Sequence, residues 1–224
     1  MRGFFYFLLL MSLSQLNCKS IFRAAYENRY TWPSGFEGYK GKCIFDNGKE
    51  KAEGDFSIGK NLKPEINNIL NEDTAAAVGS QLFEVVIHRV RRNFDEIHFK
   101  NQFNFINETK DGIEMLVMGK NEGDKYRVHN QSINMVYRKM HGIVIEIFVQ
   151  NFVDTGNGLL SERYTSQQLD QNTFEPKSPK FYYLDKFEDI GNGLWTLKSR
   201  NINYSNENKQ EKCTKFNFEQ MSSL

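Results

Sequence analysis

The chain contains, at residues 132–168, the stretch SINMVYRKMHGIVIEIFVQNFVDTGNGLLSERYTSQQ. Apolar and polar residues alternate along it with a period of two, which is typical of half-buried β-strands. His141-Gly142 and Gly156-Asn157-Gly158 interrupt the alternation, and short segments of this kind favour tight turns. The stretch therefore predicts three strands, at 132–140, 143–154 and 159–168, that pair in the order in which they occur.

The same alternation recurs on both sides of this stretch. It predicts further strands at 36–45, 50–58, 96–106, 113–119, 125–129, 180–190, 194–204 and 212–218. Asp46-Asn47-Gly48 is a strong turn signal between the first two of them. So many consecutive strands joined by short turns predict an antiparallel meander, and a sheet this large must curl.

Two segments have a helical pattern instead. Residues 71–92 carry acidic side chains in the first turn and arginines in the last turn, which suits the helix dipole. An apolar stripe of this helix is expected to face the core: Leu82, Phe83, Val86, Ile87 and Val90. Ser20 is a candidate N-cap for a second, short helix over 21–30, which must end before Trp32-Pro33.

We therefore expect one α+β domain over residues 20–224. Its core would be a large curved antiparallel meander sheet, or half-barrel, packed around one long helix, with a short N-terminal helix. Half-barrels of this kind resemble lipoprotein-carrier and lipocalin-like folds, whose concave face can hold an apolar ligand.

The N-terminal residues and the cysteines bear on the compartment. In residues 1–14, Arg2 precedes an apolar run that has the length of a signal-peptide core and is too short to span a bilayer. Export or membrane anchoring through residues 1–18 is one interpretation, and a start at Met11 that makes residues 1–10 dispensable is the other. The odd number of cysteines, Cys18, Cys43 and Cys213, favours free thiols and a cytoplasmic protein. A Cys43–Cys213 disulfide is the alternative for an exported chain.

Charge and motif content exclude several functions. Lys plus Arg number 29 and Asp plus Glu 28, and this balance argues against nucleic-acid binding. The four histidines lack metal-ligand spacing, so we expect no metal and no cofactor. Asp154-Thr155-Gly156 copies the tripeptide of aspartic proteases, but that chemistry needs two carboxylates, and a turn explains the residues better. No catalytic residue is predicted.

Charged and aromatic residues outside the expected core are candidates for binding. His88 and Arg91 share a helix face that either holds an anion or compensates the helix dipole. A further candidate is a buried polar network that would specify the fold and perform no chemistry, with the members Arg23, Glu27, Arg29, Asp154 and Arg163. The full set of binding candidates is Arg23, Glu27, Arg29, Trp32, His88, Arg91, Arg92, His98, Arg138, His141, Asp154 and Arg163.

Long segments of the chain resemble an uncharacterised family of cyanobacterial and chloroplast proteins. They are FRAAYENRYTWPSGFEGY at 22–39, EVVIHRVRRNFDEIHFKNQFNF at 84–105, GDKYRVHN at 123–130, HGIVIEIFVQNFVDTGNGLLSERY at 141–164 and the WTL strand at 195–197. The resemblance implies a photosynthetic lineage and favours the start at Met11. It implies no activity, substrate or cofactor.

These observations predict a non-enzymatic accessory or binding protein of a photosynthetic cell, with an apolar small molecule such as a lipid or pigment as ligand. Two alternatives stay open. One is an enzyme with a His/Arg/carboxylate pocket on the concave face of the sheet, and the other is an interaction partner of a photosynthetic membrane complex. An open apolar cavity would favour binding, whereas a closed core with one polar cleft at His88 or His98 would favour an enzyme.

Overall fold

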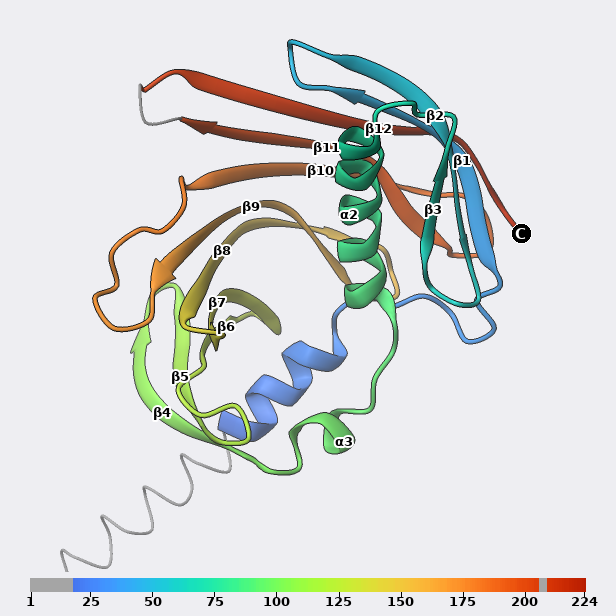
Figure 1. The fold of residues 1–224 in the computed structure, drawn as a ribbon. Helices are drawn as coiled ribbons and strands as arrows, with labels where there is room; N and C mark the ends of the chain where they lie inside the picture. Colours follow the sequence, from blue (N-terminus) through green and yellow to red (C-terminus); the bar gives the residue numbers. More distant parts are fainter. Residues whose placement is uncertain (1–17, 206–208) are drawn as a thin grey trace, which may run out of the picture. The chain divides into compact units, whose positions relative to one another are not determined.

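A computed structural model describes residues 18–205 and 209–224, so the expectations for residues 1–17 lie outside the described part. Twelve antiparallel strands follow the hydrogen-bonded order β3-β2-β1-β12-β11-β10-β9-β8-β7-β6-β5-β4 (Figure 1). Apart from the pairing of β1 with β12, every neighbour is also a neighbour in sequence. This confirms the expected α+β class and the antiparallel meander.

The strands that the alternation predicts are all present. Their bounds are β1 Gly38–Asp46, β2 Lys51–Gly59, β3 Pro64–Asn67, β4 Asn101–Thr109, β5 Gly112–Gly119, β6 Lys125–His129, β7 Ser132–Met140, β8 Ile143–Asp154, β9 Leu159–Asp170, β10 Phe181–Asp189, β11 Trp195–Ser205 and β12 Glu211–Ser223. The sequence did not predict β3. It has four residues and begins with proline, so it offers too short a pattern to recognise.

The chain forms two compact units. Unit 1 comprises residues 1–29, 92–150 and 165–179, and unit 2 comprises 30–91, 151–164 and 180–224. The chain passes from one unit to the other within β8 and within β9. Each unit has its own helix and its own apolar core.

In unit 1, strands β4 to β7 curve around a helix at residues 18–27 (Figure 1). Phe22 is buried at the centre of this core, where its ring stacks on Phe103 at 4.6 Å and contacts Tyr126 at 4.7 Å. Ser20 lies inside the helix, so its assignment as N-cap was wrong. Residues 18–20 are helical as well, although the sequence predicted a start at residue 21. Cys18 in this added turn packs in the same apolar core as Phe22.

A short helix, α3 (Phe94–His98), replaces the first residues of the predicted strand at 96–106. The side chain of Asn93 caps it by accepting the N–H groups of Asp95 at 2.8 Å and Glu96 at 3.4 Å. Because asparagine and acidic residues favour a helix start, this local signal outweighs the alternation that follows it. His98 therefore ends a helix and does not lie on a strand.

In unit 2, helix α2 (Glu72–Arg89) packs on the sheet. The Asn71 side chain caps it by accepting the Thr74 N–H at 3.1 Å. Val78 and Leu82 are fully buried, whereas Phe83 is 51% exposed and Ile87 is 42% exposed. The expectation that Phe83 and Ile87 face the core was wrong. One residue turns a helix by about 100°, so both side chains lie on a different face from Leu82.

The three cysteines of the described chain are free thiols. Cys43 of β1 lies opposite Phe218 of β12, and Cys213 lies opposite Asn203 of β11. The free-thiol prediction is confirmed, and the alternative of a Cys43–Cys213 disulfide was wrong.

Trp32 anchors the segment before β1 in the core of unit 2. Its indole is buried and stacks on Phe36 at a ring distance of 4.1 Å. The indole N–H donates to the Trp195 carbonyl at 3.2 Å. The ring thus combines a large apolar contact with a satisfied polar group.

Replacing Trp32 with alanine should lower the free energy of unfolding by about 3–5 kcal/mol, because a large buried ring leaves a cavity. Denaturant unfolding measures the loss. Tyr182→Ala, at a half-exposed tyrosine of the same unit, is the matched control and should cost much less. Near-wild-type stability of Trp32→Ala would contradict its place in the core.

Candidate functional site

The structure separates the candidate residues into two groups. Unit 1 holds Arg23, Glu27, Arg29, Arg92, His98, Arg138 and His141, and unit 2 holds Trp32, His88, Arg91, Asp154 and Arg163. Arg23 and Glu27 form the expected pair one helical turn apart, with Nε and Oε1 at 2.9 Å. Arg23 also pairs with Asp95. Both ion pairs are exposed, so they are not part of a buried network.

Arg29 follows the helix of unit 1 and folds back on it. Its Nε donates to the Tyr26 carbonyl at 3.0 Å, and its guanidinium lies 3.9 Å from the centre of the Tyr26 ring. Burial lowers the pKa of Arg29, and the positive charge of Arg138 lowers it further. The two predicted candidates, one after the helix and one on β7, thus lie within electrostatic range of each other.

Arg138 belongs to a polar cluster with Asp124 and Tyr126. Its terminal nitrogen donates to the Tyr126 hydroxyl at 3.2 Å, and its Nε lies 3.7 Å from Oδ2 of Asp124. The buried Asp124 accepts the Lys139 N–H at 3.0 Å and the Tyr126 hydroxyl at 3.4 Å. Burial raises the pKa of the Asp124 carboxyl despite these partners. The sequence analysis missed Asp124 and Tyr126, because neither belongs to a recognisable motif.

His98 is 7% exposed and lies among aromatic rings of the unit 1 core. The rings of Phe22, Tyr26 and Phe94 lie 5.4, 5.2 and 4.9 Å from the imidazole. Nδ1 lies 3.1 Å from the side-chain nitrogen of Asn101. Burial lowers the pKa of His98 to about 4, and the charges of Arg29 and Arg138 contribute. The imidazole is therefore neutral at pH 7 and accepts the Asn101 N–H.

The other candidates lie at exposed positions, Trp32 excepted. Arg91 lies beyond the end of α2, and its Nε donates to the Thr31 hydroxyl at 3.1 Å. Asp154 accepts the Gly156 N–H at 2.8 Å, which confirms the turn interpretation of this tripeptide. His141 has a φ of 52° in the turn between β7 and β8. His88, Arg92 and Arg163 are also exposed.

The most completely paired charge of the described chain, Arg200, escaped the sequence analysis. It is 3% exposed, and two of its nitrogens donate to Asp185 at 2.8 and 2.6 Å. Its third nitrogen donates to Glu84 at 2.9 Å and to Gln81 at 3.0 Å, both on α2. Burial opposes this charge, but Tyr164 and Asp185 hold the pKa of Arg200 well above its usual value.

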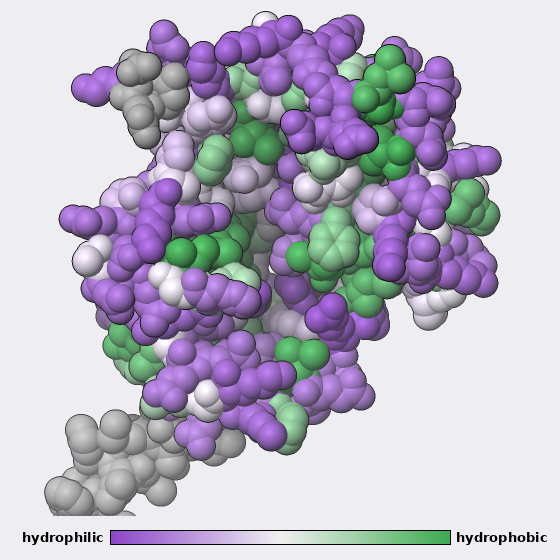
Figure 2. All heavy atoms as spheres, viewed as in Figure 1, coloured by the Kyte–Doolittle hydropathy of each residue, from purple (hydrophilic) through white to green (hydrophobic). Residues whose placement is uncertain are grey.

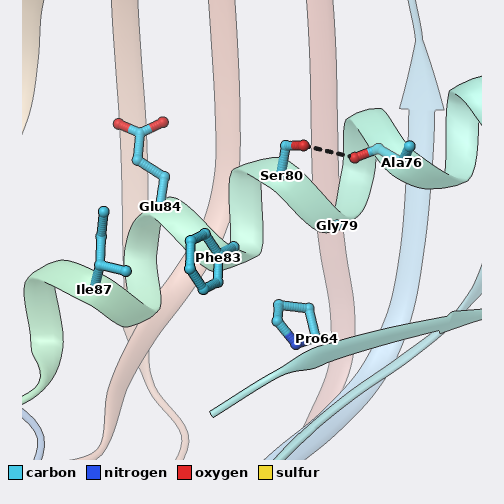
Figure 3. Close-up of a pocket in the computed structure, with 7 residues that line it drawn as sticks. All are labelled: Pro64, Ala76, Gly79, Ser80, Phe83, Glu84 and Ile87. Carbon is cyan, nitrogen blue, oxygen red and sulfur yellow. Dashed lines mark hydrogen bonds between the residues drawn. The ribbon is translucent and has the colours of Figure 1, made fainter. Parts of the chain in front are cut away.

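An open groove of about 400 Å³ runs along α2 beside β3. Its lining is Pro64, Ala76, Gly79, Ser80, Phe83, Glu84 and Ile87 (Figure 3). The Ser80 hydroxyl donates to the Ala76 carbonyl at 2.8 Å, and the Glu84 carboxylate points away from Pro64. Figure 2 shows hydrophobic side chains at the surface over α2, among mainly hydrophilic neighbours. The groove is thus mainly apolar.

A second hollow, of about 600 Å³, lies in unit 1, and its lining combines the rings of Phe99 and Phe103 with polar residues: Lys19, Ser20, Arg23, Asn101, Gln102 and Asn104. Within residues 18–205 and 209–224, no three His, Cys, Asp or Glu side chains are grouped as metal ligands. In the same ranges, no helix has the length and apolar content that crossing a membrane requires.

Comparisons with known proteins give a family and a distant structural similarity. A family model described as "Protein of unknown function (DUF3386)" matches residues 13–224. The search of curated proteins finds no match. The solved structure of a DUF1329 family protein from Desulfovibrio piger ATCC 29098 is 8% identical and matches over 94% of this chain and 93% of that chain, with a TM-score of 0.28. A similarity at this level says nothing about function.

The low pKa of His98 predicts a pH-dependent stability. Because the pKa is about 4 in the folded chain and 6.5 for a free histidine, the unfolded chain takes up the proton first as the pH falls. The free energy of unfolding therefore falls as the pH drops below about 6.5, and it falls by about 2 kcal/mol between pH 7 and pH 5.

The test compares unfolding free energies at these two pH values. The glutamine of His98→Gln can still accept the Asn101 N–H but does not titrate, so this variant should lose less unfolding free energy between pH 7 and pH 5. His129→Gln, at an exposed position in β6, should show the pH dependence of the wild type. An unchanged pH dependence in His98→Gln would show that His98 does not resist protonation.

Proposed function

We propose that this chain, which belongs to the DUF3386 family of proteins of unknown function, is a non-enzymatic binding protein that holds an apolar small molecule in the groove between α2 and β3. The observation that carries the proposal is a second apolar stripe on α2. Ala76, Phe83 and Ile87 recur at helical spacing, with the hydrogen-bonded Ser80 between them, on a face that the core does not cover.

The exposed rings and methyl groups of this stripe supply the energy of binding. Removing a phenylalanine or isoleucine side chain from water stabilises a complex by about 1.5–3 kcal/mol. Phe83 and Ile87 are about half exposed, so part of that gain is available to a ligand. A groove of about 400 Å³ also lies within the usual size range of small-molecule sites, roughly 300–1,000 Å³.

The polar side chains at the groove already have partners within the chain. The Ser80 hydroxyl is engaged by the Ala76 carbonyl, and Arg200 holds the Glu84 carboxylate. Gly79 adds no side chain to the lining. This chemistry supports an unfunctionalised hydrocarbon chain or ring as the bound part of the ligand.

His98 supports binding over the enzyme alternative. An imidazole with a pKa of about 4 is a weak base at neutral pH, and aromatic rings surround it. The cellular setting is part of the proposal. The resemblance to cyanobacterial and chloroplast segments supports a photosynthetic cell, and the free thiols support a cytoplasmic location.

Filling the groove should abolish binding of the neutral apolar dye N-phenyl-1-naphthylamine, measured by fluorescence titration. A Cβ at position 79 meets its nearest neighbour, Ile66, at 3.6 Å, an ordinary contact. Gly79→Leu should therefore fold, gain helix propensity and occupy the hollow with its longer side chain. We expect at least tenfold weaker dye binding.

Ile87→Asp should weaken dye binding to a similar extent, because a charge then lines the apolar groove. Phe105→Asp is the matched control, since Phe105 is 47% exposed on β4 of unit 1, and its affinity should equal that of the wild type. Unchanged binding in both groove variants would overturn the proposed site.

A further inference from the structure

The unit 1 hollow of about 600 Å³ lies between the helix at residues 18–27 and the border strand β4. Four consecutive strand residues, 101–104, contribute to its lining. Successive side chains of a strand point to opposite faces of the sheet, so a lining of this kind follows the outer edge of the strand. Lys19, Ser20 and Arg23 line the hollow from the helix.

The lining of this hollow is positively charged. Lys19 and Arg23 are its charged members, and none of the described residues that line it is acidic. Glu27 and Asp95 compensate Arg23 from outside the lining. Lys19 forms no ion pair with an acidic side chain of residues 18–205 and 209–224. The Lys19 ammonium is therefore the charge that a bound anion can neutralise.

The edge of β4 adds backbone donors to the hollow. β4 is the last strand of the sheet and pairs on one side with β5. Its other side has no strand partner among the described residues, and the N–H groups of such an edge can donate to an acceptor. The Asn101 side chain, in contrast, is engaged, since Nδ2 donates to Oδ1 of Asn121 at 3.0 Å and Oδ1 accepts the Asn121 N–H at 3.1 Å.

Two aromatic rings complete the lining. Phe103 is 2% exposed and stacks on Phe22, so its position is fixed by the core. Phe99 is 65% exposed, and Nζ of Lys100 lies 5.3 Å from the centre of its ring. Covering an exposed aromatic ring with another ring removes apolar surface from water. The hollow thus offers an uncovered ring and an uncompensated positive charge to the same ligand.

We propose that this hollow binds a small aromatic anion, a flat ring system that carries a carboxylate. The ring lies against Phe99, and the carboxylate meets the Lys19 ammonium and the N–H groups at the edge of β4. A volume of about 600 Å³ is within the usual range of small-molecule sites, roughly 300–1,000 Å³. The site lies in unit 1, and the charge of its ligand separates it from the α2 groove, for which we propose an apolar ligand.

An ordinary solvated surface is the competing explanation. Single exposed phenylalanines and lysines are common on soluble proteins. A surface of that kind binds aromatic acids without saturation, and no single lysine or phenylalanine matters to it. The hollow differs because an exposed ring, an ammonium group and a strand edge line one concavity.

An NMR titration of the full chain at low salt tests the proposal with two probes, 2-naphthoate and acetate. We expect 2-naphthoate to bind at one saturable site per chain. Acetate should bind at least tenfold more weakly, because it has the carboxylate without the ring. Added salt should weaken 2-naphthoate binding, since it screens the charge of Lys19.

Lys19→Gln and Phe99→Ser should each weaken 2-naphthoate binding at least tenfold, because the first removes the charge and the second removes the ring. Lys125→Gln is the control for the charge, since Nζ of this exposed lysine lies 5.2 Å from the ring of Tyr137, elsewhere in unit 1. Phe174→Ser is the control for the ring, at a phenylalanine of unit 1 that is 52% exposed. Both controls should bind as the wild type does.

Three results would overturn the proposal. The first is that 2-naphthoate does not bind at a saturable site. The second is wild-type affinity in either Lys19→Gln or Phe99→Ser, with circular dichroism showing that the variant is folded. The third is a loss of binding in Ile87→Asp, which should leave this site intact, because that loss would place the probe in the α2 groove.

Discussion

Arg200 is the residue on which the arrangement of unit 2 depends. It joins Asp185 on β10 to Gln81 and Glu84 on α2, and every one of its nitrogens has an acceptor. Breaking such a buried pair typically costs about 3–5 kcal/mol, because the remaining charge loses its partner without regaining water. The interaction also fixes the rotation of α2 about its axis. With Gln81 and Glu84 held on the sheet side, Phe83 and Ile87 must face solvent.

Arg200 in unit 2 and Arg29 in unit 1 differ in burial and in the partners that compensate their charges. Arg200 has a bidentate carboxylate, a second carboxylate and an amide, so its charge is fully compensated within the chain. Arg29 is only half-buried; its Nε donates to the Tyr26 carbonyl, and its guanidinium lies over the Tyr26 ring. Burial raises the cost of every uncompensated charge. The compensation of Arg200 therefore serves the stability of unit 2.

Local patterns sufficed to predict the strands but did not identify the sites. Strands 125–129, 132–140 and 143–154 were predicted with their observed bounds, because alternation and turn signals each depend on a few consecutive residues. The start of β4 was misplaced, since Asn93 caps a helix that alternation cannot reveal. Gln81 and Arg200 are 119 positions apart, and no spacing rule connects them. The candidate Arg138 was named individually, but only the fold shows that it contacts Asp124 and Tyr126.

The two outermost strands of the sheet differ in what they offer to another chain. β3 is four residues long and begins with proline, so it presents few backbone groups for pairing. β4 has nine residues, pairs on one side with β5, and carries the exposed Phe105 and Ile106. A long border strand with exposed apolar side chains is a template onto which a further strand can add. Self-association by strand addition, at high concentration, would therefore begin at β4.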